Sequence, residues 1–183
     1  MGDDDEHNSS STDEGRKEVD IYPLSCYYFG SKEAIVFKDE TVSDRITRMK
    51  SNYAAYGLRT SVEAVLLVEL FKHPHLLLLQ LNNSIFKLPG GRLRPGETDI
   101  DGLRRKLSNK LSASRDGNEA EWEECTKLFL VRLPESRKFI VPENLKLLAV
   151  PLSQVHENHK TYGTVISGVP QLLSKYSINI IDI

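Results

Sequence analysis

The chain has 183 residues, 39% of them hydrophobic and 27% charged, which predicts one compact globular domain. Its formal net charge is −2, so no overall positive charge attracts it to nucleic acid, and any basic site must be local. Two cysteines, Cys26 and Cys125, lack the spacing of metal ligands, which argues against a zinc cluster or a disulfide framework and favours reduced thiols.

The first part of the chain is acidic, rich in serine and almost free of large apolar side chains. Such a segment cannot bury enough surface to offset its ordering entropy. We therefore expect a disordered acidic tail over residues 1–19 and a folded domain over residues 20–183. The polar start is not a secretory signal, and no apolar run approaches the roughly 20 residues of a membrane span, so no membrane contact is expected.

The folded part begins with a β-prone run over residues 21–29, which Pro23 marks as an edge strand. A helix follows, capped by Thr41 or Ser43 and stopped by Gly57. Its apolar residues recur at helical spacing: Val42, Ile46, Met49 and Tyr53.

Two long apolar runs, residues 62–70 and 76–81, predict buried strands on either side of a turn at His73-Pro74. In this interpretation His73 and His75 are turn residues, because nothing nearby completes a metal site. Another turn at residues 82–84 leads into residues 85–88 and a Gly-Gly loop.

A second helix is expected from Asp99 to Ser112, capped by Thr98 or Asp99. Strands are predicted over residues 126–133 and 145–152. Two short terminal helices are predicted over Leu152–Glu157 and Pro170–Tyr176, the second with proline in its first turn. Strands interleaved with a few helices indicate an α/β sandwich on a mixed sheet.

The Gly-Gly loop and the second helix carry a recognisable spacing. Gly91, Glu97, Arg105 and Leu107 match the Nudix box, in which a Gly, five residues, a Glu and seven residues precede Arg-Glu-apolar-any-Glu-Glu. The three later carboxylate positions hold other residues: Lys106, Asn109 and Lys110.

These three positions lie at i, i+3 and i+4, on one face of a helix. In a working Nudix enzyme this face binds Mg²⁺ through carboxylate oxygens. Two ammonium groups and an amide cannot do so. The sequence therefore predicts a degenerate Nudix box with no catalytic residues, no metal and no cofactor.

Basic residues are numerous on or beside the box helix, and acidic residues offset some of them. They form either a solvated helix face or a patch for an RNA backbone or a partner, and both interpretations stay open. The residues are Arg92, Arg94, Arg104, Arg105, Lys106, Lys110 and Arg115.

Long stretches of the chain, from Tyr22 to the end, resemble the small Nudix-type subunit of pre-mRNA cleavage factor Im in its plant form, also called cleavage and polyadenylation specificity factor subunit 5. They include YPLSCYYFGSKEA, HPHLLLLQ, FKLPGGRLRPGE, CTKLFLVRL and VPENLKLLAVPL. The resemblance implies a Nudix-like α/β/α sandwich and a catalytically inactive homodimer in the nucleus.

In that family the subunit recognises UGUA elements in pre-mRNA for 3′-end cleavage and polyadenylation. The resemblance therefore implies pre-mRNA and a larger RRM-containing subunit as partners. Poly(A) polymerase and other 3′-processing factors are further candidate partners.

The resemblance also implies a set of RNA-binding positions. Arg45 can make paired hydrogen bonds to a base edge, Glu63 can accept from a base, and an aromatic ring can stack on one. The positions are Arg45, Glu63, Ser84, Ile85, Phe86, Leu88, Tyr162 and Gly163.

Three departures from the family pattern affect this expectation. Phe37 stands where animal members place a base-contacting Glu, and Ile85 stands where they place a stacking Phe. About thirty residues of the family pattern are also absent before the strand at 126–133, and Trp122 to Thr126, at roughly 3.3 Å per residue, is too short to replace a strand and its turns. We therefore expect the sheet to close imperfectly.

Two alternatives to an RNA-binding subunit remain. A protein-binding scaffold without RNA recognition is favoured by Phe37, Ile85 and the absent segment. An active Nudix hydrolase would need the carboxylate cluster that the box helix lacks.

Overall fold

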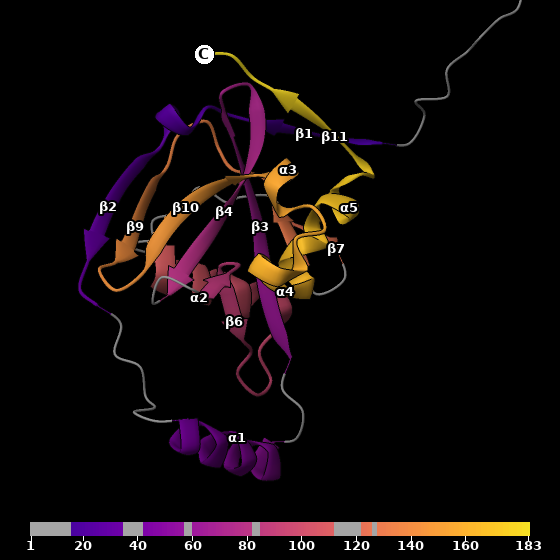
Figure 1. Cartoon of the computed structure of the whole chain (residues 1–183). Coiled ribbons are helices and arrows are strands. Elements are labelled where there is room, and N and C mark those ends of the chain that lie inside the picture. The colour runs from indigo at the N-terminus through magenta and orange to yellow at the C-terminus, as the bar shows by residue number, and fades with distance from the viewer. Residues whose placement is uncertain (1–15, 35–41, 57–59, 82–84, 112–121, 126–127) are drawn as a thin grey trace, which may run out of the picture.

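The computed structural model describes residues 16–34, 42–56, 60–81, 85–111, 122–125 and 128–183 (Figure 1). Its helices, in chain order, are η1 (Leu24–Cys26, a 3₁₀ turn), α1 (Val42–Tyr56), α2 (Asp99–Leu111), α3 (Leu152–Val155), α4 (His159–Ser167) and α5 (Val169–Leu173). Its strands are β1 (Lys17–Ile21), β2 (Tyr28–Lys32), β3 (Ser61–Leu70), β4 (His73–Leu81), β5 (Ile85–Lys87), β6 (Gly90–Arg92), β7 (Trp122–Cys125), β8 (Leu128–Val131), β9 (Lys138–Pro142), β10 (Lys146–Pro151) and β11 (Tyr176–Ile180).

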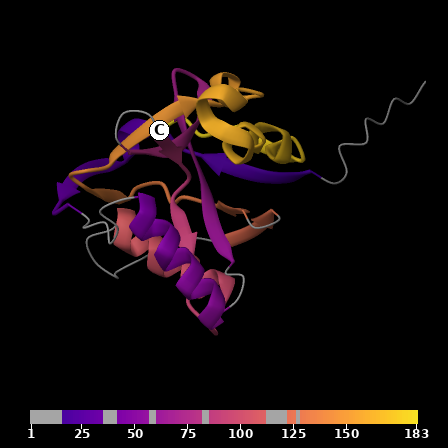
Figure 2. The same cartoon turned by 60° about the horizontal axis from the view of Figure 1, so that its bottom comes forward.

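A mixed sheet forms the centre of the described part of the chain. Its strand order is β10-β4-β3-β8-β7, with β5 beside β4 and β6 beside β3. The β3–β8 pair is parallel and its other pairs are antiparallel. Figure 2 shows α2 on one side of this sheet and α3–α5 on the other, so the expected α/β/α sandwich is confirmed.

The two cores follow from the alternation of side chains along β3. Val62, Ala64 and Leu66 face α2, whereas Val65 and Leu67 pack with the residues of α4 and α5. Because helices cover both faces, β3 and β4 consist of nearly continuous apolar runs. This arrangement explains why both strands could be predicted from the sequence.

The turn between β3 and β4 lies two residues earlier than predicted. Phe71 and Lys72 adopt positive φ angles of 52° and 66°, which suit a two-residue hairpin, and the Lys72 N–H donates to Glu69 Oε1. His73 therefore belongs to β4, as does the buried His75, so their assignment to the turn is wrong. Pro74 is tolerated in β4 because it lies beyond His75, the last residue paired with β10.

The folded domain begins earlier than the boundary expected at residue 20. Lys17–Ile21 forms β1, which pairs in parallel with β11 and buries Val19 in the core beside α4 and α5. A local reading of residues 1–19 misses this strand because its partner lies near residue 180. Residues 1–15 of the expected tail lie outside the described part.

The expectation that residues 122–126 are too short to replace a strand is also wrong. Residues 122–125 form β7, which pairs antiparallel with β8 from Trp122↔Val131 to Cys125↔Leu128. Since only two residues separate the paired ends, no long connection is needed. The edge of the sheet beside β8 is therefore occupied by a short strand.

The predicted helices are confirmed with shifted ends, and one helix was missed. Thr98 is the cap of α2, since its Oγ1 accepts from the Asp101 N–H at 3.2 Å. Pro170 lies in the first turn of α5, as predicted, but the helix ends at Leu173 and Tyr176 begins β11. The missed helix, α4, contains Tyr162 and Gly163.

Candidate RNA interface and the altered Nudix box

The side chain of Glu97 in the box is hydrogen-bonded to other residues of the protein. Its two carboxylate oxygens accept from Arg105 Nε and Nη2, both at 2.9 Å, and Oε1 also accepts from the Arg94 N–H at 3.0 Å. These bonds lower the pKa of the Glu97 carboxyl from 4.5 to about 2, with the Arg105 side chain as the largest cause. Glu97 thus fastens the loop before α2 to the helix.

The two lysines at former carboxylate positions also contact the loop. Lys110 Nζ donates to the Gly90 carbonyl oxygen at 2.6 Å, and the Lys106 side chain packs over Gly91. Burial lowers the pKa of Lys110 to about 8, with the nearby charges of Lys106 and Lys87 acting in the same direction. The box helix therefore presents a cationic group to the loop.

Arg105, a third basic residue of the box helix, also makes contacts within the protein. Arg105 is paired with Glu97 and also donates to the Arg92 carbonyl oxygen at 3.2 Å. Arg115 lies outside the described residues. No group of three or more His, Cys, Asp or Glu side chains that could hold a metal ion occurs among the described residues.

The opposite face of the sheet gathers most of the expected RNA-binding positions. Glu63 lies on β3 between β6 and β8, paired in register with Gly90 and Leu128. It lines a cleft of about 880 Å³ between β3, β8 and α4–α5, together with Ser61, Leu128, Thr164, Gly168 and Lys175. Burial raises the pKa of the Glu63 carboxyl, while Lys110 and Lys87 act in the opposite direction.

Two aromatic residues from distant parts of the chain meet on the α4–α5 side of the sheet. The rings of Phe86 on β5 and Tyr162 on α4 lie 5.0 Å apart between centroids, at an interplanar angle of 57°. Tyr162 is only 7% exposed, and its hydroxyl accepts from Gln154 Nε2 at 2.9 Å. Tyr162 therefore supports the half-buried Phe86.

Gly163 directly follows Tyr162 and interrupts α4 with φ 79° and ψ 177°, a conformation that glycine alone adopts readily. Its neighbour Thr164 lines the cleft. The helix is thus kinked at the exposed Gly163, directly before Thr164 of the cleft lining.

The remaining expected positions differ in their surroundings. Ile85 is 49% exposed at the start of β5, whereas the Leu88 side chain is buried in the core, so any RNA contact of Leu88 involves its backbone. Arg45 lies in α1, but its side chain is outside the described part, as are Ser84 and Phe37. In Figure 1, α1 lies beyond the lower end of β3.

Gln154 was missed by the sequence analysis. It sits in α3 and holds the Tyr162 hydroxyl across the gap between two short helices. No motif in the sequence marks this pair, because their contact depends on how α3 and α4 pack.

The helices in the described part of the chain are too short or too polar to cross a membrane.

Comparison with known proteins places this architecture in one family. A family model described as "Nucleotide hydrolase", the NUDIX_2 model, matches residues 17–125 and 121–176. The two matched segments meet at residues 121–125, where the sequence resemblance locates the absent segment.

Curated relatives match most of the chain. Pre-mRNA cleavage factor Im 25 kDa subunit 1 of Arabidopsis thaliana is 59% identical over 194 residues, covering 90% of this chain and 87% of the relative. Subunit 2 of the same plant is 45% identical and covers 90% of this chain and 96% of the relative. Cleavage and polyadenylation specificity factor subunit 5 of Dictyostelium discoideum is 38% identical and covers 88% and 95%.

The alignment with subunit 1 also gives the length of the absent segment. It spans 194 residues, whereas 90% of the 183 residues of this chain is about 165, so about 30 residues of the relative face a gap here. With 59% identity over nearly the whole length, and with a Nudix domain that has lost the acidic face of its box helix, the chain belongs to the family of the 25 kDa subunits of pre-mRNA cleavage factor Im.

Proposed function

We propose that this chain is a non-catalytic RNA-binding subunit of the nuclear machinery for pre-mRNA 3′-end processing, and that it recognises UGUA elements. The proposal extends to a homodimer and to a larger RRM-containing partner, as the family resemblance implies. The role in 3′-end processing is supported by relatives that are named as subunits of a cleavage factor.

One observation carries the RNA-binding proposal. Glu63 lines the cleft, Phe86 packs against Tyr162, and Tyr162–Gly163 directly precede Thr164 of the cleft lining, although the three segments are far apart in sequence. They supply a carboxylate acceptor, an aromatic surface and, at Gly163, backbone groups outside the regular helix. Single-stranded RNA is read by this combination, since its bases can be stacked and hydrogen-bonded along their edges.

Each residue has a distinct role in the proposal. Glu63 accepts from a base amino or imino group, and Phe86, supported by Tyr162, offers its ring to a base. The backbone at Gly163 contacts a second base edge. The exposed Ile85 adds apolar contact in place of an aromatic ring.

The absence of hydrolysis is part of the same proposal. Lys106, Asn109 and Lys110 supply no carboxylate oxygens for Mg²⁺, and Glu97 is already paired with Arg105. We therefore expect no Mg²⁺-dependent turnover of dinucleoside polyphosphates or nucleoside diphosphate sugars. Turnover that Glu97→Gln abolishes would contradict this expectation.

The deciding experiment measures binding by fluorescence anisotropy, with labelled RNA that contains UGUA and with a scrambled sequence of the same composition. Both are titrated with and without Mg²⁺. We expect tighter binding of the UGUA sequence, independent of Mg²⁺. Equal binding of both RNAs would instead favour a protein-binding scaffold.

A further inference from the structure

A series of hydrogen bonds inside α4 ends at the backbone carbonyl of Gly163. Ser167 is 2% exposed, and its Oγ lies 2.6 Å from the Gly163 carbonyl oxygen and 2.8 Å from His159 Nδ1. The Thr164 carbonyl oxygen is farther away, at 3.3 Å. The three residues at the centre of these bonds, His159, Gly163 and Ser167, are spaced four apart, with the kink of α4 at Gly163 between the other two.

The geometry fixes the direction of these bonds. A serine hydroxyl carries one proton, and a carbonyl oxygen can only accept. The short contact therefore assigns the Ser167 proton to the Gly163 carbonyl. His159 Nδ1 must then carry the proton that Ser167 Oγ accepts, which fixes the tautomer of the imidazole.

This series of hydrogen bonds compensates for the break in α4 at Gly163. Gly163 has non-helical angles, so the regular ladder of backbone bonds is interrupted there. The Ser167 hydroxyl supplies the Gly163 carbonyl with a donor, and His159 in turn holds that hydroxyl. Asn158, whose Oδ1 accepts from the Thr161 N–H at 3.3 Å, fixes the backbone beside His159.

We propose that His159 is a positioning residue for the RNA site: through Ser167 it orients the Gly163 peptide, and with it the backbone at Tyr162–Gly163. The inference rests on the proposed function, because it assigns His159 to the same site without direct RNA contact. Ser167 does not act as a nucleophile in this arrangement, since it is buried and its proton is committed to a carbonyl.

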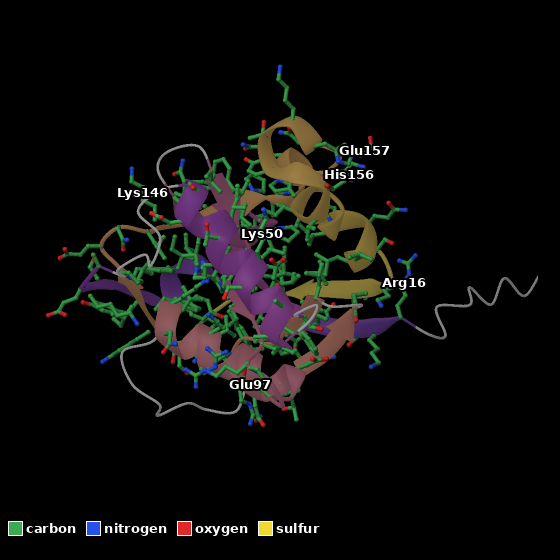
Figure 3. All side chains as sticks on the ribbon, turned by 90° about the horizontal axis from the view of Figure 1, so that it is seen from below. Arg16, Lys50, Glu97, Lys146, His156 and Glu157 are labelled. Carbon is green, nitrogen blue, oxygen red and sulfur yellow. The ribbon has the colours of Figure 1, made fainter. Side chains whose placement is uncertain are left out.

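The test compares three variants in binding to the UGUA and scrambled RNAs. His159→Ala removes the donor, and His159→Asn keeps an N–H close to the position of Nδ1. The matched control is His156→Ala, because the His156 side chain is 53% exposed beside Glu157 at the surface shown in Figure 3.

We expect His159→Ala to weaken UGUA binding by roughly fivefold to tenfold, as loss of one hydrogen bond does, and to leave scrambled RNA unaffected. His159→Asn should restore affinity to within about twofold of the wild type, and His156→Ala should match the wild type. Equal loss on both RNAs, or no rescue by asparagine, would overturn the inference.

A second readout does not depend on RNA. In ¹H–¹⁵N spectra of the free protein, the Gly163 and Thr164 amide signals should shift in His159→Ala and return towards the wild-type positions in His159→Asn. If these signals respond while the wild type fails to discriminate UGUA, the proposed function is wrong, and only the effect of His159 on the Gly163 peptide stands. If neither the signals nor the discrimination changes in His159→Ala, the positioning role is wrong.

Discussion

At the scale of single residues, Glu63, which we propose accepts from a base, also carries a cost to stability. Burial raises the pKa of its carboxyl above the ordinary 4.5, so the folded state favours the protonated form. The resulting stabilisation is complete below about pH 4.5 and is lost as the pH rises through the folded-state pKa. At neutral pH, the ionised carboxylate therefore lowers the stability of the fold.

Glu63→Gln should raise the melting temperature at pH 7 and change it little at pH 4, while it weakens UGUA binding. The gain in stability is at most about 1 kcal/mol, because the carboxyl is partly open to solvent. Melting curves at both pH values measure it, with the exposed Glu18→Gln as the control. A lower melting temperature at pH 7 would contradict the prediction.

Arg45 is the residue expected to read a base edge. Arg45→Ala should weaken UGUA binding by about 1–3 kcal/mol, the loss typical of a paired contact to a base. Lys50→Ala is the matched control, since Lys50 is an exposed cation on the same helix, labelled in Figure 3. If Arg45→Ala weakens scrambled RNA equally, Arg45 contacts only phosphate.

Lys110 gives a second prediction of pH dependence. Its pKa is lowered from 10.5 to about 8, so the folded state favours the neutral amine. This stabilisation is present above pH 10.5 and is lost as the pH falls through about 8. The free energy of unfolding of the wild type, relative to Lys110→Met, should therefore rise between these pH values by up to about 3 kcal/mol.

Urea denaturation of both proteins over this pH range measures the difference, in which the titration of other groups cancels. The exposed Lys146→Met serves as the control and should show no such rise. A difference that stays constant with pH would show that Lys110 is not desolvated in solution.

At the scale of elements, β6 approaches β3 so closely that only glycine fits at one position. A Cβ at Gly90 would lie 2.2 Å from the Val62 carbonyl oxygen and 2.7 Å from Glu63 Cα, and Gly90 also has φ 150°. Because both neighbours are backbone atoms, the clash cannot be relieved by a rotamer change. The close approach sets Glu63 beside the loop that Lys110 binds.

Gly90→Ala should lower the free energy of unfolding by at least about 2 kcal/mol, through strand displacement and strain. Gly96→Ala is the control, since it also has positive φ, 75°, but nothing lies within 4 Å of its added Cβ. That variant should lose only about 1 kcal/mol from backbone strain. Equal losses in urea denaturation would show that the packing at Gly90 has no special cost.

The elements that the sequence predicts are those with a strong local pattern. The apolar runs of β3 and β4 and the capped helix α2 could be placed because periodicity and capping depend on neighbouring residues. By contrast, β1 and β7 form by pairing with other strands, and α4 contains a glycine that indicates a turn. Their existence depends on tertiary contacts.

The features of the candidate site also differ in whether the sequence could predict them. The loss of the acidic face was visible in the spacing of Lys106, Asn109 and Lys110 within the box. The meeting of Phe86 with Tyr162 could be expected only from the family resemblance, and the Gln154 and Ser167 bonds could not be expected at all. Contacts between side chains of different elements leave no periodic signal in a sequence.

At the scale of the whole molecule, about 30 residues of the 59% identical subunit face a gap in this chain, and the family resemblance places that gap before β8. β7 occupies the sheet edge with only four residues, and a short edge strand contributes few backbone bonds. We predict that inserting the relative's segment raises the melting temperature. It should also strengthen binding to the larger subunit more than binding to UGUA RNA, because most RNA positions precede residue 90.

Thermal melting, large-subunit pull-down and RNA titration of the two chains test this prediction. An insert of equal length rich in glycine and serine is the control for chain length alone. If the two chains melt at the same temperature and capture the large subunit equally, the segment is dispensable.

The β1–β11 pair has a consequence for synthesis. β1 lies at residues 17–21 and its partner at 176–180, so β1 emerges from the ribosome long before β11 is made. Until then, Val19 and Ile21 have no complete core to enter, and the backbone of β1 lacks its partner strand. Folding of this half of the molecule must therefore wait until residues 176–180 have been synthesised, and a nascent chain arrested before residue 176 presents an open strand to chaperones.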